Sequence, residues 1–256
     1  MRVRMTRRTG VAGLAAVVAL LVGATPASAS PGDASAFGVD VAVTLLGQAA
    51  VQVGPLAVAD SDGPTSASVA SVDQPGVLRT GVVTASASRD DQSGAVTASA
   101  STVDAEVGVL GPVVGDVTAS VIAAECTATQ QGITGKSTLT DVDLGSLGPV
   151  DANAAPNTTI DVKVLNVVVG KLVLNEQVTN TDGSLTVNAL HLTLLADVLG
   201  ALGTGDVVIS SATCGPAALP IPMASGTGLW LGLGMLALFA VPAALITLRP
   251  RRAEAV

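Results

Sequence analysis

Residues 81–101 read GVVTASASRDDQSGAVTASAS, and this stretch decides the fold class. The segments 81–88 and 94–101 match at seven of eight positions, and the polar residues 89–93 stand between them. Two segments rich in Val, Ala, Thr and Ser that are joined by a short polar connection are typical of a β-hairpin. A longitudinally repeated β-structure is the alternative, although no fixed period persists over three units.

The same β pattern continues along the chain. Apolar and polar residues alternate over residues 160–164 and 185–189, as in strands with one buried face. Asp182-Gly183 predicts a tight hairpin turn, because both residues tolerate positive φ. Residues 207–209 predict a late buried strand, whereas the leucine spacing over 190–202 does not distinguish a short helix from a strand. We therefore expect an antiparallel all-β domain over residues 30–214, most simply a β-sandwich.

Composition excludes several classes of partner. The chain has no Tyr, and its aromatic residues are Phe37, Trp230 and Phe239, so the predicted domain holds Phe37 alone. A core of Val, Leu, Ile and Ala buries less area per side chain than an aromatic core. Sugars and single-stranded nucleic acids usually stack on aromatic rings, which are missing here. Residues 30–228 hold 19 acidic and 5 basic residues, a net charge of −14, which repels nucleic acid.

The N-terminus has the three parts of an export signal. Four arginines within residues 2–8 precede an apolar stretch at 11–23, which is too short to span a bilayer. Ala27 and Ala29 then occupy the −3 and −1 positions, which predicts a signal peptide over residues 1–29. An uncleaved anchor is the alternative, and the adjacent arginines leave twin-arginine export open beside the general secretory route.

The C-terminus predicts one transmembrane helix. Residues 229–248 carry no charge and have about the length needed to cross the hydrocarbon core of a bilayer. Trp230 lies at the outer edge, where an indole favours the membrane interface. The arginines that follow are Arg249, Arg251 and Arg252. By the positive-inside rule, the tail 249–256 is cytoplasmic and the β-domain is extracellular.

Two alternatives to this single-pass anchor are a buried core helix and covalent attachment to the cell wall. Wall attachment uses a Leu-Pro-x-Thr-Gly motif before a similar apolar stretch. Residues 219–223 read LPIPM and lack its Thr and Gly. We expect retention by the helix itself, after a Pro-, Ala- and Gly-rich stalk over residues 215–228.

Cys126 and Cys214 are the only cysteines. Because both would lie outside the cytoplasm, an oxidising compartment favours a disulfide between them. Two unpaired thiols are the alternative. Two cysteines and the single His191 do not make a zinc set.

Short segments at 37–47, around Cys126, and at 156–158, 174–177 and 187–191 carry a family resemblance. Together they resemble the choice-of-anchor P proteins of actinobacteria, over roughly residues 36–214. The resemblance implies a secreted domain at a Gram-positive cell surface with an anchor that varies among members. It implies no catalytic residue.

Few residues suggest chemistry. His191 stands between two leucines and has no second histidine to complete a metal or relay site, so we expect a structural or solvent-facing role. Asp60 and Asp62 could bind calcium weakly, but the full loop pattern is missing. Residues 132–137 resemble the end of a phosphate-binding loop without its first glycine, and we expect a turn there. No cofactor is expected.

The sequence leaves the function as weighted hypotheses. The first is a non-enzymatic surface protein, held in the lipid bilayer and making structural or adhesive contact with surface proteins or cell-wall polymer. The second is a calcium- or ligand-binding surface domain. An extracellular hydrolase is third. The sequence identifies no oligomeric state.

Overall fold

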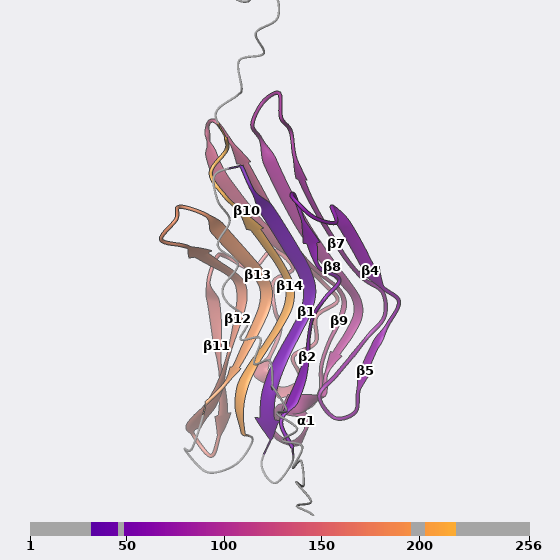
Figure 1. Cartoon of the computed structure of the whole chain (residues 1–256). Coiled ribbons are helices and arrows are strands. Elements are labelled where there is room, and N and C mark those ends of the chain that lie inside the picture. Colours follow the sequence, from indigo (N-terminus) through magenta and orange to yellow (C-terminus); the bar gives the residue numbers. More distant parts are fainter. Residues whose placement is uncertain (1–31, 46–48, 196–202, 219–256) are drawn as a thin grey trace, which may run out of the picture.

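The alternating segments pair into two antiparallel sheets in the computed structural model, which describes residues 32–45, 49–195 and 203–218 (Figure 1). Sheet A has the order β11-β12-β13-β14-β1-β2, with β3 pairing β1. Sheet B has the order β10-β9-β8-β6-β5, with β7 pairing β8 and β4 pairing β7. The two sheets pack against each other, since β1 contacts β7 and β14 contacts β8 and β9. The all-β prediction is therefore confirmed.

The strands of sheet A are β1 (Ala34–Leu45), β2 (Val51–Leu56), β3 (Ala59–Asp60), β11 (Thr158–Val164), β12 (Val167–Thr179), β13 (Leu185–Leu194) and β14 (Gly203–Cys214). The strands of sheet B are β4 (Ser66–Val69), β5 (Val72–Gln74), β6 (Leu78–Thr80), β7 (Val83–Arg89), β8 (Val96–Val107), β9 (Val117–Thr129) and β10 (Gly132–Thr140). Three short helical turns complete the described elements: η1 (Gly108–Leu110), α1 (Gly111–Val114) and η2 (Gly145–Leu147).

The repeated segment forms the predicted hairpin. β7 and β8 pair in register, with Ser86 opposite Ser99 and Ala87 opposite Ala98. The alanines and valines face the core, and the hydroxyls face outward, as the burial pattern BeBeBee of β7 records. The hairpin at Asp182-Gly183 is also confirmed, because β12 ends at Thr179 and β13 begins at Leu185.

Two expectations need correction. Residues 132–137, predicted as a turn, belong to strand β10, which begins at Gly132 directly after the β9–β10 turn. Lys136 points outward there and pairs with Glu125 on β9 at 3.0 Å. Residues 190–194 continue strand β13 and form no helix, because pairing with both β12 and β14 fixes their extended backbone.

Sheet A bends along one row of residues. Asn175, Ala189, Ser210 and Gly38 lie opposite one another in the aligned registers of β12, β13, β14 and β1. Asn175 and Ser210 have positive φ values of 49° and 57°. In each strand of this row, two successive residues face the core, which interrupts the usual alternation. The long strands bend near mid-length as a result (Figure 1).

Buried hydrogen bonds join the two sheets at this bend. The Ser210 hydroxyl donates to the Ile122 carbonyl of β9 at 2.7 Å and lies 3.1 Å from Thr102 Oγ1 of β8. Thr102 also donates to the Gly38 carbonyl of β1 at 3.3 Å. Ser210 and Thr102 are fully buried, so these bonds satisfy polar atoms that water cannot reach. A side chain at Gly38 would overlap Val83 of β7, so the close approach of the sheets requires glycine there.

Candidate functional site

The strongest polar cluster outside the core lies on the outer face of sheet A. His191 of β13 stands between Glu176 of β12 and Asp206 of β14. Its Nδ1 is 2.8 Å from Glu176 Oε2, and its Nε2 is 3.1 Å from Asp206 Oδ1. Asn188 donates to Glu176 at 2.7 Å, and Thr193 donates to Asp206 at 2.8 Å. Three adjacent strands thus place one imidazole between two carboxylates.

This arrangement favours the protonated imidazole. Neutral histidine carries one N–H and can donate to one carboxylate, whereas the imidazolium can donate to both. The hydrogen bond to Glu176 is the main reason that the pKa of His191 is raised, although burial opposes the rise. The same hydrogen bond lowers the pKa of Glu176. Only 22% of the His191 side chain and 19% of the Glu176 side chain are exposed, so water screens the pair weakly.

The cluster is poorly arranged for catalysis or for metal binding. A histidine base must accept a proton, but the carboxylates on both nitrogens of His191 hold its proton in place. Thr193 Oγ1 is 3.4 Å from Nε2, yet Thr193 already donates to Asp206. The two ring nitrogens point toward different carboxylates, so the three groups do not converge on one ion. Among the described residues, no group of three or more His, Cys, Asp or Glu side chains could hold a metal ion.

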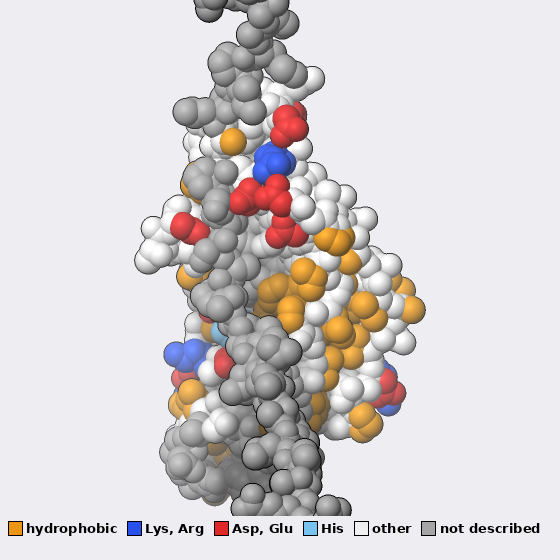
Figure 2. Space-filling model, viewed as in Figure 1, with side chains coloured by type: hydrophobic (Ala, Val, Ile, Leu, Met, Phe, Trp, Pro, Cys, Tyr) orange, Lys and Arg blue, Asp and Glu red, His pale blue; other side chains and the backbone are white. Residues whose placement is uncertain are grey.

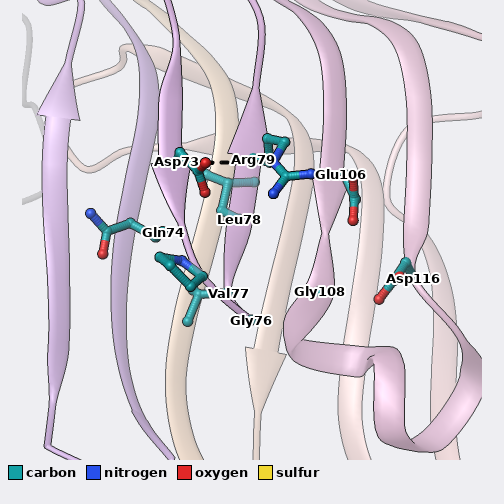
Figure 3. A pocket seen from close by; sticks show the side chains of 10 residues that line it. Asp73, Gln74, Gly76, Val77, Leu78, Arg79, Glu106, Gly108 and Asp116 are labelled. Carbon is teal, nitrogen blue, oxygen red and sulfur yellow. Dashed lines mark ion pairs between the residues drawn. The ribbon is translucent and has the colours of Figure 1, made fainter.

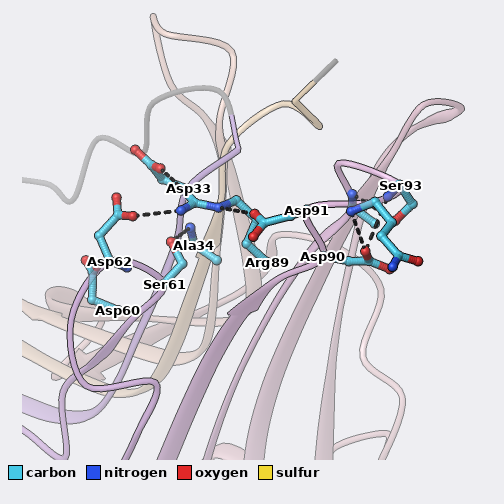
Figure 4. Close-up of polar contacts among 11 residues, drawn as sticks. Asp33, Ala34, Asp60, Ser61, Asp62, Arg89, Asp90, Asp91 and Ser93 are labelled. Carbon is cyan, nitrogen blue, oxygen red and sulfur yellow. Dashed lines mark hydrogen bonds and ion pairs between the residues drawn. The ribbon is translucent and has the colours of Figure 1, made fainter. Parts of the chain in front are cut away.

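Asp60 and Asp62, the weak calcium candidates, lie in the loop after β3. Asp60 Oδ1 accepts a hydrogen bond from the Asp62 backbone N–H at 2.8 Å. Asp62 Oδ1 pairs with Arg89 at 3.0 Å, and Arg89 also pairs with Asp33 at 3.2 Å and with Asp91 at 3.3 Å (Figure 4). Figure 2 shows this basic side chain ringed by acidic ones near one end of the domain. A guanidinium therefore already occupies the centre of the acidic group that calcium would need.

A shallow hollow of about 170 Å³ lies beside β5, β6 and η1 (Figure 3). Arg79 spans it, with Asp73 at 3.7 Å and Glu106 at 3.8 Å. Small-molecule sites usually start at about 300 Å³ and are mostly apolar. The lining residues include no aromatic side chain. The hollow is too small and too polar to serve as a typical ligand pocket.

The predicted disulfide joins Cys126 of β9 to Cys214 of β14, with a Cα–Cα distance of 6.0 Å. It covalently connects sheet B to sheet A, and both cysteines are buried. Directly after Cys214, the chain runs along the N-terminal segment: Gly215 N–H donates to the Asp33 carbonyl at 2.8 Å, and Gly32 N–H donates to the Pro216 carbonyl at 2.7 Å. The two ends of the described domain therefore lie side by side.

The predicted export and membrane segments lie outside the described residues. These include the signal peptide with Ala27 and Ala29, the apolar segment 229–248 with Trp230, and the tail with Arg249, Arg251 and Arg252. Of the predicted stalk, residues 215–218 are described. Within the ranges that the structure covers, no helix combines the length and apolar character needed to cross a membrane.

Sequence reasoning assigned His191 a structural role without finding its partners. Glu176 and Asp206 are each 15 residues from His191 in sequence, and only the strand registers bring them together. The signal that could have found Glu176 is its place in the segment 174–177, which the register sets opposite the segment 187–191. Comparison with known proteins does not extend this assignment, since no protein-family model, no curated protein and no solved structure matches the chain.

Proposed function

We propose that this chain is an exported cell-surface protein whose β-domain is held at the membrane by residues 229–248 and makes structural or adhesive contacts. The observation that carries the proposal is the position of the chain exit. Gly215 leaves β14 at one end of the long strands, beside Asp33. A tether attached there would hold the domain upright on the membrane, with its opposite end directed outward (Figure 1).

The compartment is supported by two features of the domain. The disulfide between Cys126 and Cys214 suits an oxidising environment outside the cytoplasm. The strong excess of acidic residues suits contact with water or with basic or neutral partners, and it argues against a nucleic-acid partner. The resemblance to choice-of-anchor P proteins agrees with this location and remains part of the proposal.

A non-enzymatic role is supported by the engaged state of His191. Carboxylates hold both of its ring nitrogens, which leaves no nitrogen available to activate a serine or a water molecule. The calcium-binding alternative loses support because Arg89 already neutralises the acidic loop that contains Asp62. Partners that fit the proposal are other surface proteins or a cell-wall polymer.

The test compares host cells that make the full chain with cells that make a chain ending at Ala218. The proposal expects the full chain in the membrane fraction and the shortened chain in the medium. It also expects attachment of the cells to wall material or to other cells to fall when the chain is deleted or released. Hydrolysis of wall polymers by the purified full chain, abolished in His191→Gln, would overturn the non-enzymatic part. Equal membrane retention of both chains would overturn the anchor.

A further inference from the structure

The long strands of sheet A run between two ends of the domain. We name the end that holds Cys214 the exit pole. At that end, Cys214 lies opposite both Ala34 and Leu185. The exposed turn formed by Leu165 and Asn166 joins β11 to β12 at the other end, which we name the far pole. The registers require this placement, because β12, β13 and β14 are successive antiparallel neighbours in the sheet (Figure 1).

The chain is fastened at the exit pole before it leaves. Beyond its bonds with the N-terminal segment, the exit segment contacts both hairpins of sheet B. Ala218 N–H donates to the Gly94 carbonyl at 3.0 Å in the β7–β8 hairpin. The Ala218 carbonyl accepts from Gln130 Nε2 at 2.7 Å in the β9–β10 hairpin. Tension on the chain must break these few bonds first, and it then reaches Cys214.

Strand β14 lies inside sheet A and not at its edge. It pairs with β1 from Cys214 to Gly203 and with β13 from Cys214 to Gly205. Tension that pulls Cys214 away from the far pole acts parallel to these two ladders. The hydrogen bonds of both ladders then oppose the pull together, because no pair can open before its neighbours slide. Peeling strands apart from one end would instead break the pairs one after another.

The disulfide brings sheet B into the same path. Cys126 belongs to β9, which lies between β8 and β10 over most of its length. A covalent bond cannot slip as a hydrogen bond can, so displacement of Cys214 also pulls β9 along its own two neighbours. Tension at one point of the chain is thus divided between the interior strands of two sheets.

We propose that the domain is a mechanical element that resists tension between its exit pole and its far pole, with the disulfide dividing that tension between β14 and β9. The inference rests on the proposed function, because a membrane tether after Ala218 and a contact at the far pole would supply the tension. Resistance should depend on direction: high along the strands and low when the two chain ends are pulled apart at the exit pole.

Single-molecule force spectroscopy on the exported full chain in detergent tests this directly. One handle follows Val256 in every experiment. The second handle is inserted between Leu165 and Asn166 for the axial pull, or placed at the mature N-terminus for the pull within the exit pole. At equal loading rates, we expect the axial rupture force to be several times larger, because the ladders shear in one geometry and peel in the other. Equal forces, or a weaker axial pull, would overturn the inference.

The disulfide is tested with Cys126→Ala/Cys214→Ala in the axial geometry. A lower rupture force together with a longer extension is expected, and an unchanged force in a folded variant would overturn the role of the disulfide. If this variant does not fold, the comparison of the two directions still decides the inference, since it uses the native cysteines. An unchanged melting temperature controls for the handle at the Leu165 turn. Failure of the membrane anchor would appear in cell fractionation and would leave this directional difference intact.

Discussion

The buried hydroxyl of Ser210 should contribute more to stability than any exposed hydroxyl of the domain. Ser210→Ala removes the donor to the Ile122 carbonyl and the partner of Thr102 Oγ1, at a site with no exposed surface. Leaving a buried polar group without its partner costs about 1–3 kcal/mol. We therefore expect Ser210→Ala to lower the free energy of unfolding by about 2 kcal/mol. For a domain of this size, the melting temperature should fall by about 4–8 °C.

Urea unfolding of the exported full chain in detergent measures this change, with the m-value unchanged if the folded state is otherwise intact. Ser99→Ala is the matched control, because Ser99 makes one exposed hydrogen bond, to Ser86 at 2.8 Å. Its effect should stay within about 0.5 kcal/mol. Thr102→Val in a double-mutant cycle with Ser210→Ala should give a coupling of at least about 0.5 kcal/mol. If Ser210→Ala is as neutral as the control, the bend between the sheets does not depend on this polar contact.

Three further predictions concern pH, the disulfide and the close approach of the sheets. The raised pKa of His191 stabilises the fold fully below about pH 6.5, and this contribution should be lost as pH rises through the folded pKa. The lowered pKa of Glu176 acts in the opposite range: its contribution is present above about pH 4.5 and should be lost as pH falls through its folded pKa. Melting curves across this range should show both slopes, and His191→Gln should remove the upper one; a variant with the wild-type profile would refute the ion pair. Replacing both cysteines by alanine should lower the free energy of unfolding by about 4–5 kcal/mol, since their separation of 88 residues closes a long loop, and denaturant titration that finds less than about 1 kcal/mol would contradict the clamp. Gly38→Ala should cost about 1–3 kcal/mol through overlap with β7, and thermal melting should show partial recovery when Val83→Ala is added; no recovery would place the strain elsewhere.

The sequence predicts the strands better than it predicts their bend. Alternation of apolar and hydroxyl residues identifies β7 and β8, because one face of each strand is buried and the other is wet. The bend arises where Ser210 and Asn175 adopt positive φ, a conformation that neither residue type announces in advance. Its cost is offset by contacts between strands far apart in sequence, such as that of Ser210 with Ile122.

The cysteine pair was predictable, because only two cysteines exist and the predicted compartment is oxidising. The cluster around His191 was not, since its partners are fixed by the registers of β12, β13 and β14. The acidic loop at Asp60 and Asp62 illustrates the opposite limit. Its carboxylates were visible in the sequence, but the cation that pairs with them comes from Arg89 on another strand.

The orientation of the chain in its membrane is the claim on which function and mechanical role both depend. Single cysteines placed at Leu165 and at Ala255 report the two sides, because the native cysteines are paired. In intact host cells, a membrane-impermeant maleimide should label Leu165→Cys at once and should label Ala255→Cys only after lysis. Labelling of Ala255→Cys in intact cells, with Leu165→Cys protected, would contradict the account.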